Sequence, residues 1–169
     1  MIYVRKADNT SFITELTSCD GSNQLVVATS SCIIPASVLH APPFSLPWGS
    51  SVHAKVVATN VYGSSVESLP GNGAIIITLP DAPLSLAENT QVRDITTLGI
   101  TWTDGVSDGG LAVLDYRLSI ALSDESFTIV ASGILAKSYI VTGLSTGSIY
   151  NFKVESRNAY KYSIYSDPI

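Results

Sequence analysis

The sequence predicts an all-β protein built from two related units, and three observations carry this prediction. The 169-residue chain is rich in Val, Ile, Ser and Thr, and its expected turns are rich in Gly and Asn. In most segments hydrophobic residues recur at every second position, which is the period of a half-buried strand. Residues 46–63 also recur without a gap at residues 144–161, 98 positions later, which favours two units over one.

The repeated stretch reads LPWGSSVHAKVVATNVYG in its first copy and LSTGSIYNFKVESRNAYK in its second. Val52, Ala54 and Val56 alternate with polar neighbours in the first copy, as Tyr150 and Phe152 do in the second. The stretch therefore predicts the same strand twice, each time after an L-x-x-G turn.

A short proline-rich junction, Pro80-Asp81-Ala82-Pro83, predicts the boundary between the units, so domains are expected at residues 1–79 and 80–169. In the first, we expect strands near residues 2–7, 11–16, 25–35 and 74–79, besides the repeated strand. Residues 38–48 are expected to form an irregular corner, because three prolines interrupt them. In the second, strands are expected near residues 83–89, 96–103, 114–122, 126–133 and 137–143, before the repeated strand.

The composition argues against several classes of function. Only 14% of the residues are charged and the net charge is −5, so no basic surface is available for nucleic acid. No hydrophobic run approaches the roughly 20 residues of a membrane-spanning helix, so no membrane segment is expected in these residues. The first residues, MIYVRKADNT, do not resemble a signal peptide.

The second unit resembles a fibronectin type III repeat. The residues that carry the resemblance are the leading Pro83, the core Trp102, the segment GGLAVLDYRL, the corner residues Leu144, Gly147 and Tyr150, and the pair Asn158 and Tyr160. The resemblance implies an immunoglobulin-like β-sandwich with a tyrosine corner, in which the Tyr150 hydroxyl bonds to nearby backbone. It covers this unit except for the last strand.

The first unit resembles the same repeat from its third strand onward, and it departs from the pattern in two ways. Val52 replaces the corner tyrosine, and the loop that contains Cys19 and Cys32 is inserted. Such cysteine-bearing variants resemble tandem repeats of large secreted or surface proteins of ciliated protists. The fold implied for the chain is thus two tandem sandwiches, the first without its N-terminal strands and the second without its last.

Missing strands would leave an open core and unpaired edges, which soluble domains avoid. One explanation is that these residues belong to a longer array of repeats. Another, compatible with the first, is that neighbouring subunits supply the strands by β-strand addition, which would build a filament.

Cys19 and Cys32 enclose 12 residues, and neither a C-x-x-C pair nor clustered histidines support a zinc site. We therefore predict a disulfide, with two reduced core cysteines as the alternative. A disulfide would place the protein outside the cytosol, either secreted or on the cell surface.

Catalytic and metal sites have little support, and no cofactor is expected. The chain contains neither G-x-S-x-G nor H-E-x-x-H, and its two histidines, His40 and His53, flank a proline-rich corner. Asp104, Asp108 and Asp124 lie in expected loops without the spacing of a calcium loop. Such residues favour turns in any case.

Four positions are candidates for modification or contact. Asn9-Thr10-Ser11 is an N-glycosylation sequon in an expected turn. Trp48 lies on the corner before the repeated strand and either packs on its own domain or contacts a neighbour. Tyr160 and Tyr162 are possible aromatic contacts, or else core and edge residues of the final strands.

The sequence therefore favours a non-enzymatic extracellular structural or adhesion module in a longer tandem-repeat protein. Its expected partners are other proteins, either neighbouring repeats or copies of itself. The alternatives are a ligand-binding receptor ectodomain and an accessory module of a secreted enzyme, because fold alone does not decide among these functions.

Overall fold

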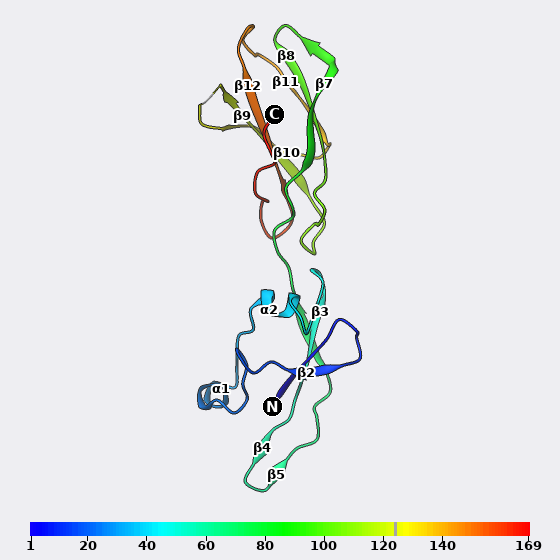
Figure 1. Ribbon diagram of the computed structural model, residues 1–169, viewed down its shortest axis with the longest axis vertical. Helices are drawn as coiled ribbons and strands as arrows, with labels where there is room; N and C mark the ends of the chain where they lie inside the picture. The colour runs from blue at the N-terminus through cyan, green and yellow to red at the C-terminus, as the bar shows by residue number, and fades with distance from the viewer. Residues whose placement is uncertain (124) are drawn as a thin grey trace. The chain divides into compact units, whose positions relative to one another are not determined.

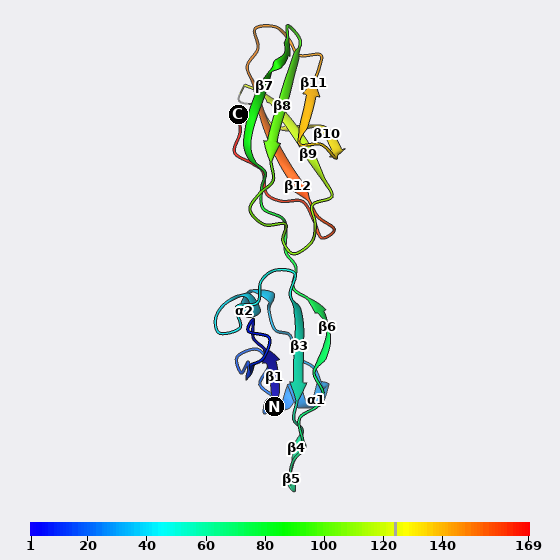
Figure 2. The same cartoon turned by 90° about the vertical axis from the view of Figure 1, so that its right-hand side faces the viewer.

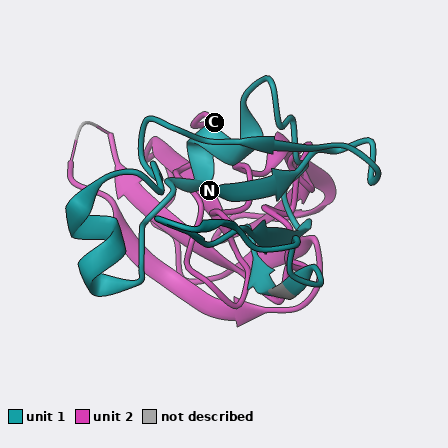
Figure 3. Ribbon diagram, turned by 90° about the horizontal axis from the view of Figure 1, so that it is seen from below, with its two compact units in different colours: residues 1–77 teal, residues 78–169 magenta. Residues whose placement is uncertain are grey.

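A computed structural model of the chain describes residues 1–123 and 125–169, and these residues form two compact units. Unit 1 comprises residues 1–77 and unit 2 comprises residues 78–169 (Figure 3). The all-β prediction is confirmed, since strands dominate both units and only two short helices occur among the described residues.

Unit 2 contains two three-stranded antiparallel sheets, whose strands are visible in Figures 1 and 2. The first sheet has the order β11-β8-β7 and the second has the order β10-β9-β12. Their bounds are β7 Leu84–Asp94, β8 Thr97–Thr103, β9 Asp115–Leu122, β10 Thr128–Ile134, β11 Ser138–Val141 and β12 Tyr150–Arg157. Each strand overlaps a segment where a strand is expected, and β7 extends five residues beyond its expected segment, to Asp94.

The core of unit 2 lies between these sheets and draws side chains from both. Ile100 and Trp102 of β8 pack in one cluster with Leu118 of β9 and Val154 of β12. Trp102 meets the ring of Tyr116 edge-on, with 5.5 Å between the ring centroids. The alternation along β8, β9 and β12 thus identifies the buried face of each strand correctly.

Unit 1 is built on one four-stranded antiparallel sheet with the order β2-β1-β3-β6. The strands are β1 Ile2–Arg5, β2 Phe12–Thr14, β3 Ser51–Val56 and β6 Gly71–Ile75, and a small hairpin pairs β4 Thr59–Asn60 with β5 Gly63–Ser64. The core comprises Val4, Leu39, Phe44, Leu46 and Ile76. Helix α2 (Ala36–His40) and the corner that follows it supply three of these residues. Unit 1 therefore has a covered sheet where unit 2 has two facing sheets.

The predicted strand at residues 25–35 is wrong, because this segment contains helix α1, Gln24–Thr29. The Asn23 side chain caps the helix by accepting a hydrogen bond from the Leu25 N–H, and Ser30 ends it in the left-handed region. None of the residues of this helix is buried, so its hydrophobic side chains are not part of the core. Short hydrophobic runs fit a helix and a strand equally well.

The last described segment of unit 2 follows the free side of β12. Ile169 and Phe152 exchange backbone hydrogen bonds of 2.9 and 3.2 Å. Unit 1 pairs Gly71 with Ala54, the residues 98 positions earlier. Ile169 thus occupies the position that Gly71, the first residue of β6, has in unit 1.

Candidate interaction surfaces

Metal-binding chemistry is absent from the described residues, where no group of three His, Cys, Asp or Glu side chains could hold an ion. Lys137 and Tyr116 donate hydrogen bonds to Asp104, and these bonds lower the pKa of that carboxyl group. Asp108 accepts a hydrogen bond from the Gly110 N–H, and Asp124 lies outside the described residues. In the same part of the chain, no helix has both the length and the apolar character to cross a membrane.

The outer face of sheet β10-β9-β12 carries two ion pairs under an aromatic ring. Arg117 on β9 donates to both carboxylate oxygens of Glu155 on β12, at 2.7 and 2.6 Å. This hydrogen bonding raises the pKa of Arg117, and Arg157 pairs with Asp115 in the same way. The Tyr162 ring lies 4.0 Å from the Arg117 guanidinium carbon. Tyr162 therefore covers ion pairs of its own unit.

A lysine on the repeated strand packs against an aromatic ring in both units. Lys55 Nζ lies 4.4 Å from the Phe12 centroid and forms an ion pair of 3.1 Å with Glu67. Lys153, 98 positions later, lies 4.4 Å from the Phe127 centroid. Tyr165 stands where unit 1 has Glu67, with its ring 5.4 Å from Lys153 Nζ. The lysine thus contacts a carboxylate in unit 1 and a second ring in unit 2.

In each unit, two serines attach the segment that follows the repeated stretch back to that stretch, and we call each pair a serine clip. In unit 2, Ser163 and Ser166 each donate a backbone N–H to β12 and accept a β12 N–H on the side-chain oxygen. In unit 1, Ser65 and Ser68 make the same bonds to Ala58 and Val56. The clips of unit 2 are buried, whereas those of unit 1 are exposed.

The tyrosine corner forms in unit 2. The Ser145 N–H donates a hydrogen bond of 2.9 Å to the Tyr150 hydroxyl, and this bond lowers the pKa of the phenol. Gly147, between them, has φ +80°, a left-handed conformation that glycine adopts without strain. Leu144 packs against the core. In unit 1, Val52 stands at the equivalent position and packs against its own core without a hydroxyl.

The loop after β12 is held by Asn158 and presents Tyr160. The buried Asn158 amide donates to the Thr78 and Asp108 carbonyls, and its oxygen accepts the N–H groups of Tyr160 and Lys161. Tyr160 is 50% exposed. Of the two tyrosines predicted as contacts, Tyr160 thus has the freer ring.

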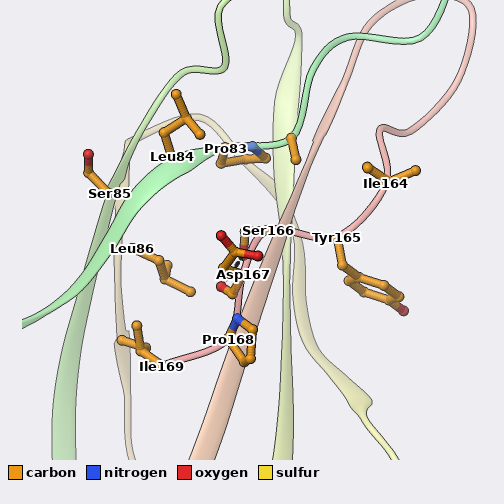
Figure 4. Close-up of a pocket in the computed structure, with 11 residues that line it drawn as sticks. Pro83, Leu84, Ser85, Leu86, Ile164, Tyr165, Ser166, Asp167, Pro168 and Ile169 are labelled. Carbon is orange, nitrogen blue, oxygen red and sulfur yellow. Dashed lines mark hydrogen bonds between the residues drawn. The ribbon is translucent and has the colours of Figure 1, made fainter.

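A groove of about 350 Å³ lies at one edge of unit 2, between residues 82–86 and 164–169 (Figure 4). Its walls are the start of β7, an edge strand, and the segment that carries Ser166. Leu86 and Ile169 contribute hydrophobic side chains to it. At this groove, the outer strand β7 of one sheet and residues 164–169 beside the other sheet leave a space between them.

In unit 1, a disulfide joins Cys19 and Cys32, as predicted, and closes the loop that contains α1. Cys19 is buried and belongs to the unit's interior. Trp48 packs against the core of unit 1 and stacks on His40, with 4.6 Å between centroids. The structure therefore places Trp48 within its own unit.

The sheet of unit 1 has two outer strands, β2 and β6. Ile76 uses its backbone N–H and C=O to bond Ser50 and Gly49, on the side of β3. Because successive residues of a strand point their backbone groups to opposite sides, those of Ile75 face away from β3. The Ile75 side chain is 58% exposed. β6 is thus an open edge with a hydrophobic side chain on it.

Asn9 lies in the turn that joins β1 to β2. Its own N–H bonds the Lys6 carbonyl, and Lys6 N–H bonds the Ser11 carbonyl at 2.9 Å. Asn9 has φ +62° and its side chain is exposed. The Asp8 carboxylate accepts the N–H groups of Thr10 and Ser11, and these bonds lower its pKa.

Comparison with known proteins agrees with this architecture. The fibronectin type III domain model matches residues 82–169, which is slightly more than half of the chain. The chain belongs to the fibronectin type III family. This domain type is a non-catalytic module that mediates contacts between proteins.

The chain covers a small part of a curated relative and about half or more of two similar solved structures. Pikachurin of Rattus norvegicus is 26% identical over 91 residues, which is 53% of this chain and 9% of pikachurin. A structure of domains A168–A170 of titin matches 99% of this chain and 52% of its own, with a TM-score of 0.57 and 18% identity. A human fibronectin type III domain matches 66% of this chain and 89% of its own, with a TM-score of 0.51 and 17% identity. The two structures support the fold alone.

Sequence reasoning missed the ion pairs under Tyr162 and the serine clips. The clips had a sequence signal, because the ungapped repeat continues past residue 161, with Ser65 and Ser68 aligned to Ser163 and Ser166. The ion pairs had a weaker one. Charged residues on the outer face of a strand are usually solvated. Glu155 is only 5% exposed, and the sequence does not reveal this because its partner Arg117 lies on a neighbouring strand that is distant in the chain.

Proposed function

We propose that the chain is a non-enzymatic module of a longer extracellular or cell-surface protein, with domains at residues 1–79 and 80–169. The module makes structural or adhesive contacts with neighbouring repeats or with copies of itself. Its contacts include β-strand addition at the open edges of its sheets, which would extend copies into a filament.

The observation that carries this proposal is the open edge β6 of unit 1. An edge strand offers unpaired backbone donors and acceptors to another chain, and natural proteins usually block such edges with charges or prolines. The segment Gly71–Ile75 contains neither, and Ile75 is largely exposed. The groove between β7 and residues 164–169 offers a second open margin in unit 2.

The extracellular location rests on the Cys19–Cys32 disulfide, since disulfides persist in oxidising compartments. The similarity to a segment of pikachurin supports a role as one module among many, because that segment is 9% of the relative. Family membership supports a binding or spacing role, since this domain type carries no catalytic machinery of its own.

The edge is tested by removing one outward-facing backbone N–H. We expect the oxidised protein to associate with increasing concentration in sedimentation-velocity runs. Ile75→Pro should abolish this association, because proline has no N–H to donate. Ile75→Ala keeps the N–H and is the matched control, which should still associate. A protein that stays monomeric at every concentration, or association that survives in Ile75→Pro, would contradict the proposed edge.

A further inference from the structure

The β1–β2 turn presents an asparagine side chain that the fold does not use. Asn9 is exposed, and no hydrogen bond of its amide group is found among the described residues. Asp8 caps the turn instead, because its carboxylate accepts hydrogen bonds from the Thr10 N–H at 2.9 Å and the Ser11 N–H at 2.7 Å. The Asn9 amide is therefore free to react without loss of a structural contact.

The same turn supplies the full acceptor sequence, Asn9-Thr10-Ser11, without proline at the middle position. Its backbone leaves the sheet at Lys6 and returns at Ser11, so the four exposed residues between them project from the hairpin. Asparagine tolerates the left-handed φ of +62° at this position. A sequon on a hairpin tip is accessible to a transferase that acts on an extended or turned acceptor.

We propose that Asn9 carries an N-linked glycan, and that this glycan shields the edge strand β2. The inference rests on the proposed extracellular location. Transfer forms a bond between Asn9 Nδ2 and the anomeric carbon of an oligosaccharide carried on a lipid diphosphate. The bond from that carbon to the diphosphate oxygen breaks, the amide nitrogen loses one proton, and the lipid diphosphate leaves.

The shielding role follows from where the turn lies in the sheet. β2 is an outer strand of the order β2-β1-β3-β6, and it begins at Phe12, three residues after Asn9. A hydrated glycan at that distance keeps another chain from pairing with β2, which is one way of protecting an edge. The other outer strand, β6, lies across the sheet and stays open. The glycan thus directs association to β6.

Occupancy is tested by fusing the chain to a secretion signal and expressing it in a glycosylating eukaryotic host. We expect a mass increase that N-glycosidase removes, with conversion of Asn9 to aspartate. Ser11→Ala should abolish the modification, whereas Ser11→Thr preserves the sequon and should keep it. Secreted, disulfide-bonded protein with an unmodified Asn9 would overturn the site, and it would leave the proposed association through β6 untouched.

Shielding is tested in the Ile75→Pro background, where the β6 edge is blocked. The glycosylated variant should stay monomeric, and enzymatic deglycosylation should restore association through β2. If deglycosylation leaves it monomeric, the shielding role is overturned. Failure of the wild-type protein to associate through β6 would instead count against the proposed function, because occupancy is measured separately.

Discussion

At the scale of single residues, hydrogen bonds and ion pairs of polar side chains around the core stabilise unit 2. The Tyr150 hydroxyl fixes the corner before β12 through one bond from the Ser145 N–H. Glu155 and Asp115 are buried charges, and each receives a paired arginine. A buried charge without such a partner is strongly destabilising.

We expect Tyr150→Phe to lower the melting temperature of unit 2 by at most a few degrees, because the Ser145 N–H loses its protein partner at an exposed site where water replaces part of the bond. Tyr139→Phe is the matched control, since Tyr139 packs against the same core and no bond of its hydroxyl is found in the described structure. The measurement is thermal unfolding followed by circular dichroism. Equal melting temperatures for the two variants would argue against a stabilising corner.

Arg117→Ala should destabilise unit 2 by about 3 kcal/mol, because it leaves the Glu155 carboxylate buried without a partner. Arg93→Ala breaks a pair with Glu88 in which the arginine side chain is 58% exposed, and should change stability little. Denaturant titration of both variants checks this difference. Similar losses would show that burial of Glu155 does not matter.

At the scale of elements, the serine clips show how one sequence pattern acts differently in two surroundings. Each clip joins the segment that follows the repeated stretch to that stretch, through two hydrogen bonds to serine side chains and two between backbone groups. The strand N–H that each clip satisfies is buried at Val154 and exposed at Val56. Water can replace the serine only at the exposed site.

Ser166→Ala should therefore cost about 1–2 kcal/mol, since the buried Val154 N–H is left unsatisfied. Ser68→Ala, at the same place in unit 1, should be nearly neutral because water reaches Val56. Urea unfolding of the two variants, monitored separately for each unit, makes the comparison. An equal cost at both positions would contradict the role of burial.

The disulfide is the element that closes the inserted loop of unit 1. Replacing Cys19 and Cys32 together by Ser should lower the stability of unit 1 by about 3 kcal/mol, because an open loop gains entropy in the unfolded chain. Unit 2 should unfold as before and serves as an internal control. Non-reducing mass spectrometry checks the bond itself, and two free thiols in the native protein would contradict the Cys19–Cys32 disulfide.

At the scale of the whole molecule, the two units differ in how much of a sandwich they contain. Unit 2 buries hydrophobic side chains between two sheets, whereas unit 1 covers a single sheet with α2 and the corner after it. Unit 1 accordingly has fewer buried hydrophobic side chains in its core than unit 2.

We expect residues 80–169 alone to unfold cooperatively, and residues 1–79 alone to fold poorly, because a small core supports little stability. Circular dichroism and the dispersion of amide resonances compare the two fragments. A sharp, cooperative transition for residues 1–79 would show that the single sheet suffices.

Much of this architecture could be predicted from the sequence, because strands leave a local signal. Alternation located all six strands of unit 2, and the 98-residue repeat related β3 to β12. The corner tyrosine is implied by the resemblance of unit 2 to the fibronectin type III family, and the disulfide by two cysteines that no zinc motif accounts for. Each of these features depends on neighbours in the chain, which the sequence displays directly.

Tertiary structure decided the remaining features, because they depend on residues far apart in the chain. α1 replaces the strand expected at residues 25–35; Asn23 caps this helix, and the helix buries none of its residues. Trp48 packs inward because α2 brings His40 beneath it. Glu155 is buried because Arg117, 38 residues away, meets it across two strands. Burial is a property of the assembled unit, so the sequence determined the strands and the structure determined which edges and side chains remain open.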